Sequence, residues 1–214
     1  MTIGIIGAGA LGSNAARLFA KSGISATIAN RGGPETMAGL VRELGPLIEA
    51  GTVRDVATAD VVLVALRWRD LTEALRGLSP WNGRIVIDAT NAVDFLDPNS
   101  PDAKDPGNPL AAYGIKAVDL GGKHSSAVVQ TLVPGARVVK ALNHFDVRLL
   151  PEPAVSGGKR VLFYSGDDAA AKAVVRKILD QTGHFPVDLG VLDVGGPLAS
   201  LPFGPLAAGS FIKI

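Results

Sequence analysis

Short apolar runs alternate along the chain with segments of helical periodicity. The runs at 2–6, 24–29, 59–66 and 84–90 are almost wholly apolar. Runs of this kind are typical of strands that are buried on both faces of a parallel sheet. Between them, one helix is predicted over 11–22 and a second from Pro34 onward, because apolar residues recur there every three or four positions. This alternation predicts an α/β fold, a doubly wound and mostly parallel sheet covered by helices on both faces.

The middle of the chain contains a polar interruption. Residues 91–114 are rich in Pro, Asp and Asn and are too long for an ordinary connection. We interpret them as a surface loop with a function or some mobility. A possible strand at 115–120, a short helix at 125–132 and a buried strand at 136–142 follow.

The last third repeats the strand–helix–strand order. A strand is predicted at 159–166, and a helix follows with Asp167 as its N-cap, a residue type that favours this position. Gly183 ends that helix, and 185–190 form a final strand. The tail, 191–214, is apolar but broken by Gly and Pro. Such a tail has to be covered by its own chain or by a second subunit.

A glycine-rich loop follows the first strand. Gly7, Ala8, Gly9, Ala10, Leu11 and Gly12 form a G-x-G-x-x-G that opens the first helix. In a strand–helix–strand unit this motif serves dinucleotides: the first glycine allows the tight turn, the second lets the backbone approach a pyrophosphate, and the third permits close helix–strand packing. The free N–H groups of residues 10–12 and the helix dipole then hold the anion.

The end of the second strand distinguishes between the two nicotinamide cofactors. In NAD-binding units an acid at this point accepts hydrogen bonds from the ribose 2′-hydroxyl and would repel a 2′-phosphate. Here the chain has Asn30 followed by Arg31. Arginine presents a planar fork of donors that suits phosphate, and the asparagine amide can also donate. The pair favours NADP(H).

Composition narrows the classes of function. The 214 residues are 47% hydrophobic and 19% charged, with a net charge of +1, so a packed core is expected and no general attraction to nucleic acid or anionic membranes. No apolar run approaches the roughly 18 residues of a membrane span, and no leader pattern opens the chain, which predicts a cytoplasmic protein. The absence of cysteine excludes thiolate catalysis, and three scattered histidines make a metal site unexpected.

Several stretches beyond the glycine loop resemble one family. They are "IANRGGPET" after the second strand, "IDATNAVDF" (87–95), "VDLGGKHSSAVVQTLVPGARVVKALNHF" (118–145) and "SGDDAAAKAVVRKILDQTGHFPVDLG" (165–190). Together they are similar to the coenzyme F-420-dependent NADP oxidoreductases over nearly the whole chain. The regions 91–114 and 195–214 depart from that family's pattern, and both would contact the second substrate.

The resemblance implies a division of the chain and a placement of the cofactor. Residues 1–146 would form a Rossmann-type NADP-binding domain, and 147–214 a small α/β extension that completes the substrate cleft. NADP would lie with its pyrophosphate at Ala8–Leu11 and its 2′-phosphate at Asn30 and Arg31. The nicotinamide would face the later strand ends, at Leu66, Arg67 and Trp68, Thr90 and Asn91, and Ala141, Leu142, Asn143 and His144. A deazaflavin, coenzyme F-420, would dock over the nicotinamide, and the protein would be a homodimer.

The chemistry leaves alternatives open. Transfer of hydride between two bound rings needs proximity and alignment more than acid–base groups, and the sequence has no obvious Ser/Tyr–Lys pair. Reduction of a C=N or C=O bond in a small molecule also needs a proton, for which His144 is the candidate catalytic residue. Ser125 and Ser126 are expected to cap a helix, and Asp88 and Asp119 to orient loops. A ferric or flavin substrate, or an NADP-binding redox sensor, remains possible.

Overall fold

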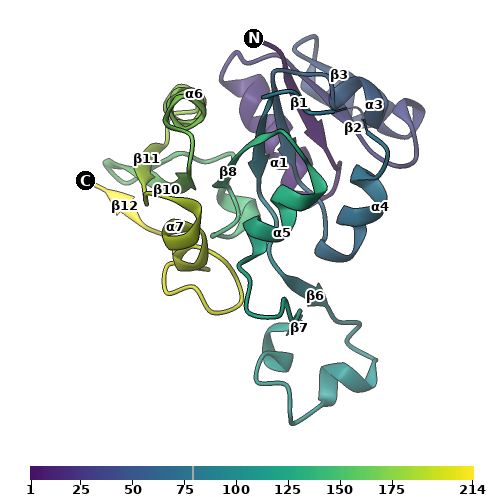
Figure 1. The fold of residues 1–214 in the computed structure, drawn as a ribbon. Coiled ribbons are helices and arrows are strands. Elements are labelled where there is room, and N and C mark those ends of the chain that lie inside the picture. Colours follow the sequence, from purple (N-terminus) through teal and green to yellow (C-terminus); the bar gives the residue numbers. More distant parts are fainter. Residues whose placement is uncertain (79) are drawn as a thin grey trace.

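The computed structural model describes residues 1–78 and 80–214. Its main sheet has the order β11–β10–β8–β5–β4–β1–β2–β3. The strands β1 (Ile3–Ile6), β2 (Ala26–Ala29), β3 (Ile48–Ala50), β4 (Val61–Val64), β5 (Ile85–Asp88) and β8 (Arg137–Ala141) are all parallel to one another. Strand β10 (Gly158–Gly166) pairs antiparallel with β8 and parallel with β11 (Phe185–Asp188). The doubly wound, mostly parallel sheet predicted from the apolar runs is confirmed (Figure 1).

Two separate clusters of buried side chains cover the two faces of this sheet. On one face, α1 (Ala10–Lys21) and α6 (Ala169–Gln181) bury their apolar sides, with α2 (Ala38–Leu44) packed beside them. On the other face lie α3 (Val53–Val56), α4 (Leu71–Leu75), α5 (Ser125–Leu132) and α7 (Leu192–Leu198). Successive strand residues alternate between the clusters, so Ile5 belongs to the first and Ile6 to the second. This explains why the strands are apolar throughout.

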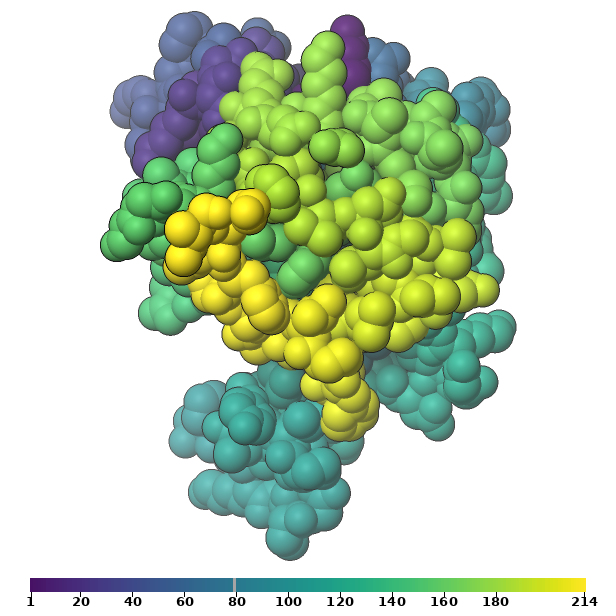
Figure 2. Space-filling view, turned by 90° about the vertical axis from the view of Figure 1, so that its left-hand side faces the viewer, coloured from purple at the N-terminus to yellow at the C-terminus, as the bar shows by residue number. Residues whose placement is uncertain are grey.

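The C-terminal third continues the same sheet. Leu162 and Tyr164 on β10 and Val175 on α6 belong to the same apolar cluster as Ile3 and Ile5 on β1. Two short strands, β9 (Ala154–Val155) and β12 (Ile212–Lys213), pair with the start of β10. Figure 2 shows that α6, β10, β11, α7 and the tail form one continuous face of the molecule.

The predicted loop at 91–114 contains ordered structure. Strand β6 (Val93–Phe95) pairs antiparallel with β7 (Ile115–Ala117) in a two-stranded sheet of their own. Two 3-10 turns, η3 (Pro101–Lys104) and η4 (Ala111–Tyr113), lie between them. This segment, which we call the arm (residues 92–118), projects from the body of the protein (Figure 1). The strand expected at 115–120 therefore exists but pairs within the arm, outside the main sheet.

The tail is more regular than its Gly and Pro content suggests. It forms α7, which the sequence analysis did not predict, and β12 follows the strand that was expected to be last. A Cβ on Gly195 would come within 2.5 Å of the Ser165 Cβ on β10. The glycine that weakens the helix locally is thus what lets α7 pack against the sheet.

Three further 3-10 turns complete the described elements: η1 (Pro34–Met37), η2 (Trp68–Asp70) and η5 (Val147–Leu149). One cap differs from expectation. The N-cap of α6 is Asp168, whose side chain accepts from the Ala171 N–H at 2.6 Å, whereas Asp167 accepts from the Leu192 N–H at the start of α7. Among the described residues, none forms a helix long and apolar enough to cross a membrane.

Candidate functional site

The glycine loop has the geometry that an anion requires. Gly7 has φ +111°, and a Cβ there would come within 2.2 Å of the Ala65 carbonyl oxygen. A Cβ on Gly12 would collide with the Gly7 carbonyl oxygen. At Gly9, by contrast, a Cβ would meet no atom within 4 Å among the described residues. Gly7 and Gly12 therefore serve the fold, whereas Gly9 leaves space beside the N-terminus of α1.

That N-terminus is free to bind an anion. Within the described residues, no side chain caps α1, and its first turn contains no acidic residue. The loop curls back on itself through a hydrogen bond from the Ser13 hydroxyl to the Ala8 carbonyl oxygen at 3.0 Å. The N–H groups at the start of a twelve-residue helix therefore face open space with the positive end of the helix dipole behind them.

A cavity of about 530 Å³, which we call the arginine cavity, lies on one side of the loop. It is lined by Gly7–Gly9, Asn30 and four arginines, Arg31, Arg54, Arg67 and Arg76, with Asp70 and Glu73 as the acidic members. The arginines come from the end of β2, from α3, from the segment after β4 and from the end of α4. Arginines outnumber acids by four to two, so the cavity is suited to a ligand with several negative charges.

A second cavity of about 440 Å³, the asparagine cavity, lies on the other side of the loop. It shares Gly9, Ala65, Leu66 and Arg67 with the arginine cavity. The remaining walls come from the start of α1, the segments that follow β4, β5 and β8, the arm and the tail: Ala10, Leu11, Trp68, Ala89, Thr90, Asn91, Val93, Phe95, Leu142, Asn143, Phe145, Val147 and Leu201. The two cavities thus form one track along the carboxyl edge of the parallel strands, where α/β sheets bind their ligands.

Asn91 and Asn143 form a pair in this second cavity. The Asn91 amide donates to the Asn143 carbonyl oxygen at 2.7 Å, and the Asn143 amide donates to Asn91 Oδ1 at 3.0 Å. The pair also holds the tail: the Leu201 N–H donates to Asn91 Oδ1, and the Asn143 amide donates to the Ala199 carbonyl oxygen. In the described residues the buried Asn143 Oδ1 has no hydrogen-bond partner. It is an acceptor that a ligand donor, such as a carboxamide NH₂, would satisfy.

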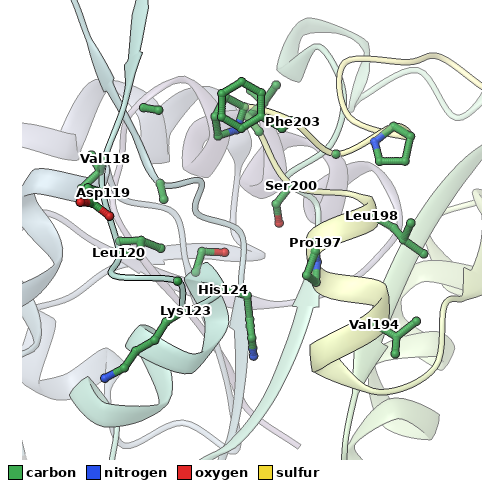
Figure 3. Close-up of a pocket in the computed structure, with 18 residues that line it drawn as sticks. Val118, Asp119, Leu120, Lys123, His124, Val194, Pro197, Leu198, Ser200 and Phe203 are labelled. Atoms are coloured by element: carbon green, nitrogen blue, oxygen red, sulfur yellow. The ribbon is translucent and has the colours of Figure 1, made fainter.

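A third cavity, of about 760 Å³, lies between the base of the arm, the start of α5, and α7 with the tail (Figure 3). We call it the large cavity. Its walls are mostly apolar, including Leu120, Pro197, Leu201 and Phe203, and Leu201 also lines the asparagine cavity. The large cavity is therefore a neighbour of the cofactor track and has room for a second ligand.

One histidine links two walls of the large cavity. His124 is the N-cap of α5, where its Nδ1 accepts from the Ala127 N–H at 3.2 Å. Its Nε2 lies 2.7 Å from Asp193 Oδ1 on α7. Because Nδ1 acts as an acceptor, Nε2 carries the proton and donates to Asp193. Ser125 and Ser126, expected as caps, instead point into a buried polar cluster, so the expected cap is corrected to His124.

That cluster is centred on Lys140, whose side chain is 1% exposed. Lys140 Nζ donates to Asp88 Oδ2 at 3.0 Å, to Ser125 Oγ at 3.2 Å and to the Thr90 carbonyl oxygen. Asp88 also accepts from the Thr90 N–H, the Thr90 hydroxyl and the Ser126 hydroxyl. Burial lowers the pKa of the Lys140 ammonium, and the adjacent Asp88 carboxylate opposes that effect. As the sequence analysis expected of it, Asp88 orients the loop that follows its strand.

His144 occupies a different environment from the cavities. Its ring is 1% exposed and packs between Phe145 and Phe163, with ring centroids 5.1 and 4.9 Å away. Within the described residues neither ring nitrogen has a hydrogen-bond partner. Burial lowers the pKa of His144 to about 4, so the ring is neutral at pH 7. It lines none of the three cavities described above.

The other residues predicted for the cofactor are distributed unevenly. Gly7, Ala8, Gly9, Asn30, Arg31, Leu66 and Arg67 line the arginine cavity, and Gly9, Ala10, Leu11, Leu66, Arg67, Asn91 and Asn143 line the asparagine cavity. Gly12 and Ala141 are buried and line neither cavity. Asn30 is held in place because its amide donates to the Thr36 hydroxyl at 2.9 Å.

Sequence reasoning missed Arg54, Arg76, Phe95 and Lys140. Arg54 and Arg76 belong to no motif and approach the glycine loop only through the fold. Phe95 was assigned to a loop, yet its ring lies 5.7 Å from the Arg67 guanidinium, within the range of a cation–π contact. A lysine between the apolar residues of the predicted buried strand "ARVVKAL" was the one signal that could have marked Lys140.

Comparisons with known proteins show which family and which solved structures the chain is similar to. Residues 2–92 match the model of a family described as NADP oxidoreductase, coenzyme F420-dependent. No curated protein matches the chain. Among solved structures, a hypothetical protein from Sinorhizobium meliloti is 37% identical over all of this chain and 96% of its own, with a TM-score of 0.87.

Two further structures are more distant. A candidate F420-dependent NADP reductase from Arthrobacter sp. FB24 is 27% identical over 90% of this chain and 86% of its own, with a TM-score of 0.65. A reductive aminase from Aspergillus terreus, solved with NADPH and ethyl levulinate, is 22% identical with a TM-score of 0.60. The match covers 94% of this chain but 57% of the aminase, and at that identity it shows the fold alone.

Proposed function

We propose that this chain, an NADP-dependent oxidoreductase whose residues 2–92 match the family of coenzyme F420-dependent NADP oxidoreductases, transfers hydride between NADP(H) and a deazaflavin or a similar flat acceptor. Bound NADPH supplies the hydride at its nicotinamide ring. The residues of the chain bind the two partners, align them and exclude water.

The arginine cavity is the observation that carries the cofactor assignment. Its four arginines gather beside Asn30, where an NAD-binding unit has an acid. Arg31, Arg54 and Arg76 are exposed and form no ion pair within the described residues. They are therefore available to a 2′-phosphate. The adenosine end of the cofactor belongs in this cavity, and the pyrophosphate belongs beside Gly9 at the start of α1.

The asparagine cavity suits the nicotinamide end. Asn143 lines this mostly apolar cavity, and within the described residues its buried Oδ1 has no partner. It would accept a hydrogen bond from the nicotinamide carboxamide, which fixes the rotation of the ring. The Asn91–Asn143 pair thus orients the ring, while the tail that it anchors separates this cavity from the large one.

The large cavity is the proposed place for the second substrate. Its apolar walls accommodate a flat ring system, and the shared residue Leu201 marks where the two ligands would meet. The division into a cofactor domain, 1–146, and an extension, 147–214, is part of this proposal, since α7 and the tail supply one wall of that cavity.

We also propose that the protein is a cytoplasmic homodimer. Several exposed apolar side chains lie on α7, the tail and its flanks: Phe185, Val191, Val194, Phe203, Phe211, Ile212 and Ile214. A second copy of the chain would cover this C-terminal face (Figure 2). Sedimentation equilibrium should give twice the mass of the chain, and replacement of Phe203 and Ile212 by Ser should shift the protein toward a monomer.

The direct test is a titration with NADPH and NADH, followed by mixing with coenzyme F-420 or with FMN while the nicotinamide absorbance is recorded. We expect tight NADPH binding and oxidation by the deazaflavin. Arg54→Gln and Arg76→Gln should each weaken NADPH binding by about tenfold and leave NADH unchanged. Arg42→Gln, a surface arginine away from the cavities, is the control. Equal binding of NADH and NADPH by the wild type would contradict the assignment.

Reduction of a C=N or C=O bond is the alternative, with His144 as its proton donor. The same assay with imines and ketones decides between the two. Because a pKa of about 4 leaves His144 neutral at pH 7, we expect His144→Gln to keep most of the turnover. A loss of about a hundredfold or more would favour His144 as the donor.

A further inference from the structure

Lys140 has no part in the transfer described above, yet it is a charged side chain in the core of the sheet. The described structure accounts for all three of its ammonium protons: they go to the Asp88 carboxylate, the Ser125 hydroxyl and the Thr90 carbonyl oxygen. Lys140 and Asp88 are also paired in register on the adjacent strands β8 and β5.

Stability alone does not explain such a pair. Removal of two charges from water costs free energy that their mutual attraction only partly returns, so apolar replacements are often as stable. Val138, one pleat away on the same face of β8, belongs to an apolar cluster, and an apolar side chain would suit this environment. The pair is better explained by what it holds in place.

Each of the three acceptors belongs to a different part of the site. Thr90 immediately precedes Asn91, which lines the asparagine cavity. Ser125 is the first residue of α5 and lines the large cavity. Asp88 ends β5 and accepts from the Thr90 N–H, which fixes the turn that leads to Asn91. One ammonium group therefore connects a wall of the cofactor cavity to a wall of the large cavity.

We infer that Lys140 is a positioning residue that sets the separation between the nicotinamide and the second substrate. The inference rests on the proposed function. Transfer of hydride between two rings depends steeply on their distance and alignment. The Ser125 oxygen accepts from Lys140, and residues 1–78 and 80–214 offer its own proton no acceptor. That hydroxyl can donate to an acceptor atom of the second substrate, such as a ring carbonyl or nitrogen.

The test uses a neutral double replacement. Lys140→Met alone leaves the Asp88 carboxylate buried without its cation and should lower the melting temperature strongly. The variant Lys140→Met/Asp88→Asn removes both charges, and the asparagine can still accept from the Thr90 N–H. We expect its melting temperature to recover most of that loss.

Two ligands then separate positioning from general loosening. The probe 2′,5′-ADP fills only the arginine cavity, and its affinity should stay within about twofold in the double variant. NADPH also fills the asparagine cavity, and its affinity and rate of oxidation should fall by about tenfold or more. If Lys140 had a structural role without positioning, the affinities for NADPH and 2′,5′-ADP would fall by the same factor, or neither would change.

The variant Ser125→Ala leaves the Lys140–Asp88 pair intact. It therefore tests the inference even if the double variant does not fold. We expect NADPH affinity within about twofold of the wild type and turnover lower by about tenfold. The control is Ser165→Ala, which removes a buried hydroxyl opposite Lys140 on β10. If the ratio of NADPH affinity to 2′,5′-ADP affinity is the same in the double variant as in the wild type, the inference is wrong while the proposed function stands. A wild type that binds neither ligand would overturn both.

Discussion

At the scale of single residues, the three glycines of the phosphate loop, Gly7, Gly9 and Gly12, are required for different reasons. A Cβ would collide with backbone at Gly7 and Gly12, whereas at Gly9 it would enter open space. The same motif therefore combines two positions that the fold requires with one that the ligand requires. Of the three glycines, only Gly9 should be replaceable without loss of structure.

Gly9→Ala tests that distinction. Gly9 has φ −75°, which alanine adopts readily, so the free energy of unfolding should fall by less than about 1 kcal/mol. NADPH binding should weaken by about tenfold or more, because the methyl group occupies the space beside the N-terminus of α1. Gly12→Ala is the matched comparison and should destabilise the fold itself. Urea unfolding and a fluorescence titration measure the two effects, and unchanged NADPH affinity in Gly9→Ala would be evidence against this placement of the pyrophosphate.

At the scale of elements, two adjacent aspartates stabilise the N-termini of two different helices, α6 and α7. Asp168 caps α6, and Asp167 reaches the start of α7. The sequence analysis assigned the α6 cap to Asp167, because both residues favour N-caps and only the backbone geometry distinguishes them. Helix α7 itself was not predicted, since Gly195, Gly196 and Pro197 weaken its local propensity.

Amide hydrogen exchange separates the two aspartates. Asp168→Ala should cost about 1 kcal/mol and speed exchange in the first turn of α6, at Ala171. Asp167→Ala should leave α6 protected and speed exchange at Leu192 instead. The opposite pattern would return the α6 cap to Asp167.

At the scale of the whole molecule, two buried histidines link stability to pH. Burial lowers the pKa of both His144 and His184 to about 4, against about 6.5 in an unfolded chain. The unfolded state therefore binds more protons than the folded state between these values. The stability that results is fully present above pH 6.5 and is lost as the pH falls toward 4.

The expected loss is roughly 3 kcal/mol for each histidine over that range. Urea unfolding at pH 7, 6 and 5 should show it as a falling free energy of unfolding. His184→Gln should reduce the slope with pH by about half, whatever its effect at pH 7. A stability that does not change between pH 7 and pH 5 would mean that the two rings are not buried in the neutral form.

The sequence by itself determined the parallel sheet, the glycine loop and the Asn30–Arg31 pair. Each of these is a local signal: an apolar run, a turn that needs glycine, or a charge next to a strand end. The gathering of Arg54 and Arg76 on the arginine cavity, the Asn91–Asn143 pair and the Lys140–Asp88 pair were decided only by the tertiary structure. The members of both pairs lie 52 residues apart, and no local pattern encodes which distant strand ends meet. That choice follows from the order of strands in the sheet, which brings β5 and β8 side by side and aligns Asp88 with Lys140.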